Sequence, residues 1–158
     1  MLSAEEKREI DKEIAIVPYK KSACLGALKI IQQNRGGWLS DDSLKDVAEY
    51  LEMSEYEVDS IASFYNMLHR HPVGKHVILI CDGVSCYIMG YMSIMEYLQK
   101  KLGISEGETT SDGLFTLLTM PCQGLCDEAP SMIIGTERHT FLTPEKVDKI
   151  LDDLRKAN

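Results

Sequence analysis

The chain has 158 residues, a net charge of −8 at pH 7 and a hydrophobic fraction of 44%, which is typical of a globular protein with one or two cores. An acidic surface repels phosphate groups, so the charge argues against a nucleic-acid partner. No apolar run approaches the roughly 20 residues that cross a bilayer, and the acidic N-terminus resembles neither a signal peptide nor a transit peptide. We therefore expect an intracellular protein with no direct membrane insertion.

The first 70 residues carry only helical patterns. Ser3 with Glu6 and Ser54 with Glu57 match the capping box, in which a serine is followed three residues later by a glutamate. Apolar residues at helical spacing then predict helices over about 3–14, 22–33, 42–51 and from 54 to about 65. Because the third and fourth helices are strongly acidic, a plain helical bundle is favoured over a helix-turn-helix that reads DNA.

Residues 69–76 hold three of the four histidines, together with a proline and a glycine. This composition predicts a solvated basic linker, which we favour over a metal site.

The pattern changes to strands and helices after this linker. The short apolar run 77–80 predicts a buried strand, residues 89–102 a helix that ends at Gly103, and 115–119 a second strand. Residues 132–134 and 139–142 predict a hairpin around Gly135, and Thr143-Pro144 starts a last helix that ends near residue 155. The order β-α-β-β-α fits a thioredoxin-like layer of sheet and helices. The expected fold class is α+β, with a helical segment over 1–70 and a thioredoxin-like domain over 75–158.

Four of the five cysteines form two close pairs. Cys81 and Cys86 lie in C-D-G-V-S-C, Cys122 and Cys126 lie in C-Q-G-L-C, and 35 residues separate the pairs. Each pair follows a predicted strand, so both are expected at the rim where open α/β sheets place their sites. An odd number of cysteines is a poor disulfide framework. The four paired thiols are therefore candidates to enclose one metal ion or one iron–sulfur cluster.

The spacing leaves two occupants open. Zinc accepts four thiolates, but its structural sites commonly use tighter pairs and support domains that lack a core. A [2Fe–2S] cluster is wider and takes two thiolates for each iron, which suits longer loops. The C-x-x-C spacing of a thioredoxin-type dithiol is absent. The spacing favours the cluster modestly over zinc.

The wider motif resembles a known family. C-D-G-V-S-C-Y-I-M-G followed by C-Q-G-L-C-D-E-A-P is similar to the thioredoxin-like [2Fe–2S] ferredoxins, and more closely to the small [2Fe–2S] subunits of NADH:quinone oxidoreductases (respiratory complex I). The resemblance extends over nearly the whole chain, through A-L-K-I-I-Q-Q-N-R-G-G-W-L, V-D-S-I-A-S-F-Y, P-V-G-K-H-V-I and S-D-G-L-F-T-L. The doubled glycine at Gly36-Gly37, where relatives often carry one, is a departure far from the cysteines.

The resemblance implies a site, a cofactor and partners. The metal and cofactor ligands would be Cys81, Cys86, Cys122 and Cys126, which would hold one [2Fe–2S] cluster, with no catalytic residue of the chain's own. The chain would be a one-electron carrier within an oxidoreductase, next to a flavoprotein subunit that binds FMN and NADH, among the other subunits of the peripheral arm. It would lie in the cytoplasm, at the inner face of the cytoplasmic membrane through the complex. The chain lacks G-x-G-x-x-G, so we expect it to bind neither FMN nor NADH itself.

Other assignments remain alternatives. The same kind of subunit serves the diaphorase modules of NAD-linked hydrogenases and formate dehydrogenases. A zinc-binding Cys₄ interaction module and a regulatory iron–sulfur sensor are the alternatives from other classes.

Several further residues carry expectations of their own. Trp38 and Tyr65 are candidates for a docking surface and equally for core positions. Cys24 is expected in the core, and Met89, Met92 and Met95 are expected to pack. Because thioredoxin-like folds often place a cis-proline at this point, we expect a cis Ala129–Pro130 bond.

Overall fold

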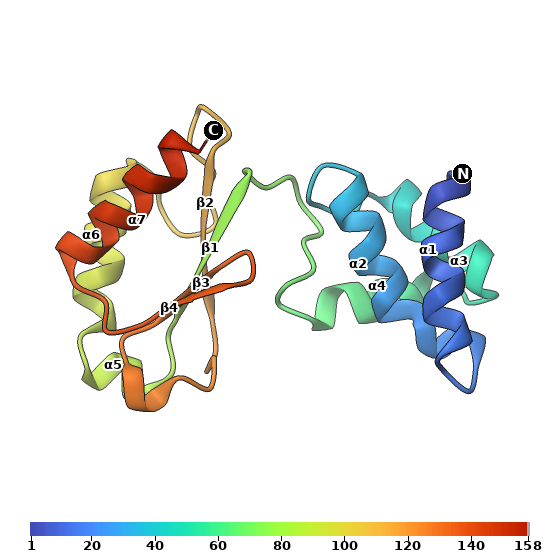
Figure 1. Cartoon of the computed structure of the whole chain (residues 1–158), viewed down its shortest axis with the longest axis horizontal. Helices are drawn as coiled ribbons and strands as arrows, with labels where there is room; N and C mark the ends of the chain where they lie inside the picture. Colours follow the sequence, from blue (N-terminus) through green and yellow to red (C-terminus); the bar gives the residue numbers. More distant parts are fainter. Residues whose placement is uncertain (158) are drawn as a thin grey trace. The chain divides into compact units, whose positions relative to one another are not determined.

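The computed structural model describes residues 1–157 and divides into two compact units, Met1–Val73 and Gly74–Asn158 (Figure 1). Asn158, the last residue of the expected second domain, lies outside the described residues. The observed mixture of helices and sheet confirms the expected α+β class. Within residues 1–157, no helix combines the length and apolar character needed to cross a membrane.

The first unit is a helical bundle, as the sequence predicts. Its helices are α1 (Ala4–Ala15), a short 3-10 helix η1 (Lys20–Ala23), α2 (Cys24–Asn34), α3 (Asp41–Leu51) and α4 (Glu55–Phe64). Both predicted capping boxes are present, at Ser3 for α1 and at Ser54 for α4. The core includes Ile10, Leu28, Ile31, Val47, Leu51 and Val58.

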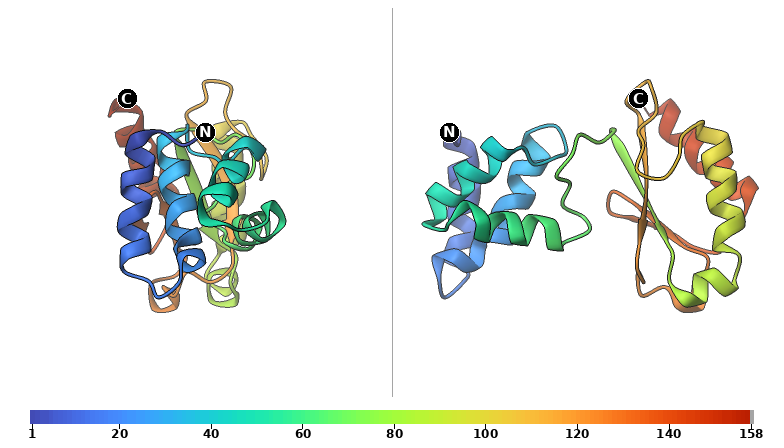
Figure 2. Two further views of the ribbon diagram at one scale, coloured as in Figure 1. Left: turned by 90° about the vertical axis from the view of Figure 1, so that its right-hand side faces the viewer. Right: turned by 180° about the vertical axis from the view of Figure 1, so that it is seen from behind.

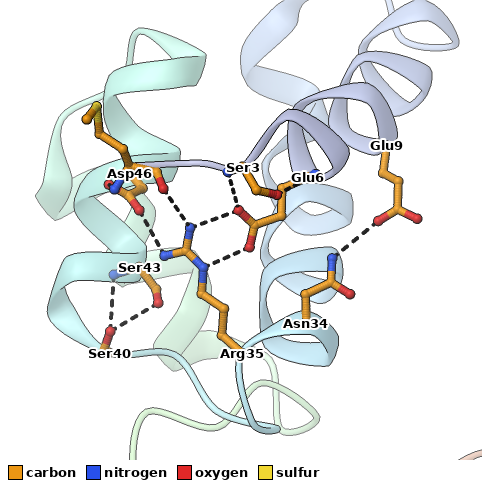
Figure 3. A network of polar contacts seen from close by, with 9 residues as sticks. Ser3, Glu6, Glu9, Asn34, Arg35, Ser40, Ser43 and Asp46 are labelled. Carbon is orange, nitrogen blue, oxygen red and sulfur yellow. Dashed lines mark hydrogen bonds and ion pairs between the residues drawn. The ribbon is translucent and has the colours of Figure 1, made fainter.

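A partly buried ion-pair network joins three segments of this unit (Figure 3). Arg35, just after α2, donates from Nε to Glu6 Oε1 at 2.8 Å and from Nη1 to Asp46 Oδ2 at 2.8 Å. The hydrogen bond from Arg35 lowers the pKa of Glu6 to about 2, against the effect of burial. Burial alone would raise the pKa of Asp46. The hydrogen bonds from the Met1 ammonium and Arg35 outweigh this effect, so the pKa of Asp46 is lowered. The network thus ties α1 and α3 to the end of α2.

The start of the segment that follows α4 is held by side-chain bonds, which corrects the prediction of a solvated linker for residues 69 and 70, whereas His71, Pro72 and Lys75 are exposed as expected of a linker. Arg70 donates from Nε to Asp59 Oδ1 at 2.7 Å, from Nη2 to Asp41 Oδ1 at 2.6 Å, and from Nη1 to the carbonyl oxygen of Leu39. The backbone N–H of His69 donates to Gln32 Oε1 at 2.7 Å, and burial lowers the pKa of His69. These contacts make residues 69 and 70 part of the helical unit.

The second unit is a four-stranded sheet with its two long helices on one face (Figure 2). Its elements are β1 (His76–Cys81), α5 (Val84–Ile88), α6 (Tyr91–Leu102), β2 (Phe115–Met120), the 3-10 turn η2 (Cys126–Glu128), β3 (Met132–Ile134), β4 (Glu137–His139) and α7 (Pro144–Lys156). The strand order is β2-β1-β3-β4, with β1 parallel to β2 and the other pairs antiparallel. The core lies between the sheet and α6 and α7.

The structure corrects two element predictions. The fourth strand spans Glu137–His139 rather than 139–142, because a two-residue turn at Gly135 and Thr136 pairs Ile134 with Glu137 and so fixes the hairpin register. Phe141 has a φ of +47°, which is not a strand conformation. The short helix α5 was not predicted, because apart from Cys86 it buries no residue and shows no inward apolar stripe.

Candidate metal centre

The two cysteine pairs lie at the same end of the sheet. Cys81 is the last residue of β1 and is in register with Met120, the last residue of the parallel strand β2. Cys122 follows two residues later, and Figure 1 shows α5, which holds Cys86, and the turn η2, which begins at Cys126, at this end. The predicted placement of both pairs at one rim is confirmed.

Gly83 lies where the two cysteine-bearing loops come together. A Cβ atom at this position would lie 3.4 Å from Cys81 Sγ and 3.5 Å from the backbone of Cys122. A larger side chain would therefore fill the space between the loops. The absence of a side chain keeps this space free for whatever the thiols hold.

The four thiols are arranged as two pairs. Cys122 Sγ and Cys126 Sγ lie 3.5 Å apart, and the thiol of Cys86 shares a hydrogen bond with that of Cys81. The first pair is buried and the second is exposed, and none of the five cysteines, all within the described residues, forms a disulfide. In the described part of the chain, no three or more His, Cys, Asp or Glu side chains form a group arranged for one metal ion.

The environment of the exposed pair shifts the pKa values of its two thiols in opposite directions. The backbone N–H of Gly124 donates to Cys122 and, with the hydrogen bond from Cys126, lowers the pKa of the Cys122 thiol. Gly124 has a φ of +77°, a conformation that favours glycine. The shared hydrogen bond raises the pKa of Cys126, while a hydrogen bond from Ser85 on α5 opposes the increase. Cys122 is therefore the readier of the two to become a thiolate.

The buried pair has a different environment. Burial raises the pKa of the Cys86 thiol, and the hydrogen bond with Cys81 raises it further. Hydrogen bonds from the side chain and the backbone of Ser131 lower it and so favour the thiolate. The Ser131 carbonyl oxygen also accepts the backbone N–H of Cys81 at 3.0 Å. Ser131 thus contacts both cysteines of this pair.

The fifth cysteine lies away from these pairs. Cys24 is buried on α2 in the helical unit, where it belongs to the core as predicted. Burial, together with the charge of Glu57, raises the pKa of its thiol to about 11. A thiol so rarely ionised is a poor ligand and a poor nucleophile.

Other predictions have mixed outcomes. The cis Ala129–Pro130 bond is confirmed. Met95 is buried, but Met89 and Met92 are exposed, so the prediction that all three pack is wrong. Trp38 is half-buried and Tyr65 is 43% exposed, so Tyr65 is not a core residue.

Three features of the site were missed in the sequence. Gln123 follows Cys122 and Ser131 follows Pro130, and each is a polar residue next to apolar ones. This contrast in polarity was the only sign in the sequence that could have drawn attention to them. The third is a group of exposed apolar side chains on α5 and the start of α6, which we call the α5 patch: Val84, Tyr87, Ile88, Met89 and Met92. From the sequence alone, apolar residues are expected in the core, so the exposure of these side chains could not be predicted.

Four thiols in two pairs fit a cluster of two irons, because each iron of a [2Fe–2S] centre takes two cysteine thiolates. The free space beside Gly83 and the hydrogen-bond donors around the sulfurs fit the same group. The class that the fold and the thiols define is a small iron–sulfur protein with a thioredoxin-like sheet.

Comparisons with known proteins identify the family. The family model for the thioredoxin-like [2Fe-2S] ferredoxins matches residues 10–155, and the chain belongs to this family. It is 42% identical over 151 residues to the E-type subunit of the NADH-quinone oxidoreductase of Escherichia coli (strain K12), which covers 96% of this chain and 90% of the relative. It is 40% identical over 152 residues to the subunit of the same type from Pseudomonas aeruginosa, covering 96% and 91%.

A solved structure shares the fold. A chain of the NAD+-reducing [NiFe]-hydrogenase in the H2-reduced state superposes with a TM-score of 0.68 over 82% of this chain, at 22% sequence identity. This chain spans about a fifth of the length of that hydrogenase chain, 22%. The likeness concerns the fold alone.

Proposed function

We propose that this chain is the electron-transfer subunit of an NADH:quinone oxidoreductase, in which it holds one [2Fe–2S] cluster next to the flavin of the NADH-oxidising subunit. The observation that carries the proposal is the pairing of four thiols at one rim of the sheet, in a chain that belongs to a [2Fe–2S] ferredoxin family. The near-full-length relatives, which are subunits of NADH-quinone oxidoreductases, support the choice of complex.

The proposed ligands are Cys81, Cys86, Cys122 and Cys126, and the proposed domains are the helical segment 1–70 and the cluster domain 75–158. A bound [2Fe–2S] cluster supplies one-electron transfer. The chain's own residues bind it through four thiolates. Buried Cys81 and Cys86 keep water from one side, while exposed Cys122 and Cys126 form the side that faces outward.

The α5 patch supports a partner at that outward side. Ser85, the residue after Val84, hydrogen-bonds to Cys126 of the second cysteine loop, so the patch borders the exposed thiols. Five large apolar side chains exposed together are typical of an interaction surface. We propose that the flavoprotein subunit that binds FMN and NADH docks here, because electron transfer requires the two cofactors to lie close together. Through that complex the chain would lie at the inner face of the cytoplasmic membrane.

Metal analysis tests the proposed cofactor. Anaerobically purified or reconstituted chain is expected to contain two irons and two acid-labile sulfides, and to give a one-electron paramagnetic signal after dithionite reduction. One zinc per chain with no colour and no signal, persisting after reconstitution, would instead support the zinc-binding interaction module.

Binding to the flavoprotein tests the proposed partner. NADH is expected to reduce the cluster rapidly when the flavoprotein subunit is present, and not when the chain is alone. Ile88→Glu on the α5 patch should weaken the complex at least tenfold. Ile16→Glu is the matched control, because Ile16 and Ile88 are almost equally exposed, at 77% and 75%, and Ile16 lies in the helical unit. The docking proposal is wrong if Ile16→Glu weakens binding and Ile88→Glu does not.

The diaphorase module of an NAD-linked hydrogenase remains the second candidate. It shares the proposed cluster and the flavoprotein partner, and the fold likeness to a hydrogenase chain is its support. Co-purification from the native organism separates the two, because the attached subunits would reduce quinone in one case and oxidise hydrogen in the other.

A further inference from the structure

Ser131 presents a fully buried hydroxyl between two groups that compete for its proton. It is 0% exposed and lies just before β3. Its Oγ is 3.3 Å from Gln123 Oε1, to which it donates, and 3.7 Å from Cys86 Sγ. A hydroxyl has one proton, so at any moment either the amide oxygen or the sulfur receives it.

Gln123 is fixed in the orientation that this competition requires. Its Nε2 donates to the carbonyl oxygen of Leu79 in β1 at 2.7 Å, which leaves Oε1 directed at Ser131. Gln123 also lies between Cys122 and Cys126 in the sequence. Ser131 therefore links the loop of the exposed pair to a sulfur of the buried pair, and its hydroxyl donates to one of the two sides at a time.

We propose that Ser131 is a positioning residue that raises the reduction potential of the cluster by donating its hydroxyl proton to Cys86 Sγ in the reduced state, in competition with Gln123. This inference rests on the proposed function, because it requires the four thiolates to hold the cluster. One electron enters on reduction, and no covalent bond forms or breaks. The proton stays on Ser131 Oγ and only its direction changes.

Electrostatics gives the sign of the effect. Reduction adds one negative charge, which the thiolate sulfurs share, so a donor to sulfur stabilises the reduced state more than the oxidised one. Because Ser131 is buried, water neither screens the hydrogen bond nor replaces it. Gln123 Oε1 stabilises the other orientation of the hydroxyl, and so limits the gain.

A structural role alone would leave the potential unchanged. Thr116 provides the matched control, because its hydroxyl is also buried in this unit and it lies near the start of β2, at the end of the strand away from the cysteines. Its Oγ1 accepts the backbone N–H of Gly74 at 2.6 Å and pairs with Thr109 Oγ1 at 2.7 Å. Thr116→Val removes these bonds without touching a cysteine.

The experiment is a redox titration of the reconstituted full chain, followed by EPR, for the wild type, Ser131→Ala, Gln123→Met and Thr116→Val. At a fixed solution potential, Ser131→Ala should lower the ratio of reduced to oxidised cluster by about three- to tenfold, where tenfold corresponds to about 59 mV for one electron. Gln123→Met should raise the ratio, because Cys86 Sγ is then the remaining acceptor. Thr116→Val should leave it unchanged.

Each outcome decides the proposal. Ser131→Ala with full iron and sulfide and an unchanged potential overturns it. If Ser131→Ala does not assemble a cluster, Gln123→Met decides alone: a raised potential supports the proposal, and an unchanged or lowered one overturns it. A wild-type chain that takes up no cluster is a different result, because it contradicts the proposed function itself.

Discussion

The unit Met1–Val73 buries a carboxylate, Glu6, against the partly buried guanidinium of Arg35, in addition to the neutral hydroxyl of Ser43. Among the described residues of the second unit no charged side chain is buried, and its buried hydroxyls include those of Thr116 and Ser131. The ion pairs of the second unit involve side chains at its surface, such as Lys101 with Asp148 at 3.0 Å. The two units therefore differ in whether they bury a charged side chain.

The difference follows from what each unit holds. A helical bundle gains orientation from a fixed ion pair, at the cost of desolvating two charges and of becoming sensitive to pH. A buried carboxylate beside a thiolate-bound cluster would add negative charge where reduction already adds one. Hydroxyl and backbone N–H groups, as at Ser131 and Gly124, can donate to sulfur without adding any charge.

The largest effect is expected from removing a proposed ligand. Cys86→Ala should reduce the iron and sulfide content to a small fraction of the wild-type value and remove the EPR signal of the reduced protein. Cys24→Ala is the matched control, because it removes the buried thiol of the helical unit, and it should keep the full cluster. Metal analysis and EPR of both variants check this. A two-iron cluster with wild-type spectra in Cys86→Ala would exclude Cys86 as a ligand.

The next largest effect is expected in the ion-pair network. Arg35→Met leaves the buried carboxylate of Glu6 without its main partner and removes one of the two partners of Asp46, so it should lower the free energy of unfolding of the helical unit by about 3 kcal/mol. Trp38 is the single tryptophan and lies in this unit, so its fluorescence during denaturant unfolding reports the change. Arg8→Met, at an exposed arginine of α1, should stay within about 0.5 kcal/mol. Equal effects of the two variants would show that the network contributes no stability.

Acid should also act on the helical unit through Glu6. The pKa of this carboxyl is about 2 in the folded chain, below its ordinary value of 4.5. The stabilisation is therefore complete above about pH 5 and is lost as the pH falls from there toward 2, to an extent of about 2 kcal/mol. Denaturant unfolding followed by Trp38 at several pH values measures this loss. Glu6→Gln should flatten the pH dependence, and a variant with the wild-type slope would assign it to other carboxyls.

Much of the architecture could be predicted because local chemistry specifies it. The capping boxes at Ser3 and Ser54 mark helix starts, the apolar run before Cys81 marks a buried strand, and paired cysteines after two strands indicate the candidate site. In each case the residues that carry the signal are neighbours along the chain. The same holds for the motif that resembles the ferredoxin family.

The remainder depends on contacts between residues that are distant in sequence. Ser131 becomes important because the fold brings it beside Cys86, 45 residues away, and Gln123 because its amide reaches Leu79. Arg70 looks like part of a solvated linker until its partners Asp41 and Asp59 are known. No local pattern encodes such contacts, so they become visible only in the folded chain.

The smallest effects are expected at helix caps, where the two units can be compared with the same kind of substitution. Ser54→Ala removes the acceptor for the N–H of Glu57 in α4, and Thr143→Ala removes that for Lys146 in α7. Each should cost about 1 kcal/mol of unfolding free energy in its own unit. Trp38 fluorescence follows the first, and loss of the cluster's visible circular dichroism follows the second.

Ser60→Ala is the matched control for Ser54→Ala. Ser60 lies inside α4 and its hydroxyl donates to the carbonyl oxygen of Tyr56 at 2.8 Å, a bond that competes with the helix backbone. Alanine is the better helix former at an exposed interior position, so this variant should be neutral or more stable by a few tenths of a kcal/mol. The same exchange of serine for alanine should thus lower stability at the cap and not lower it six residues further along the same helix. If both variants lose the same stability, the hydrogen bond at the cap is not what stabilises α4.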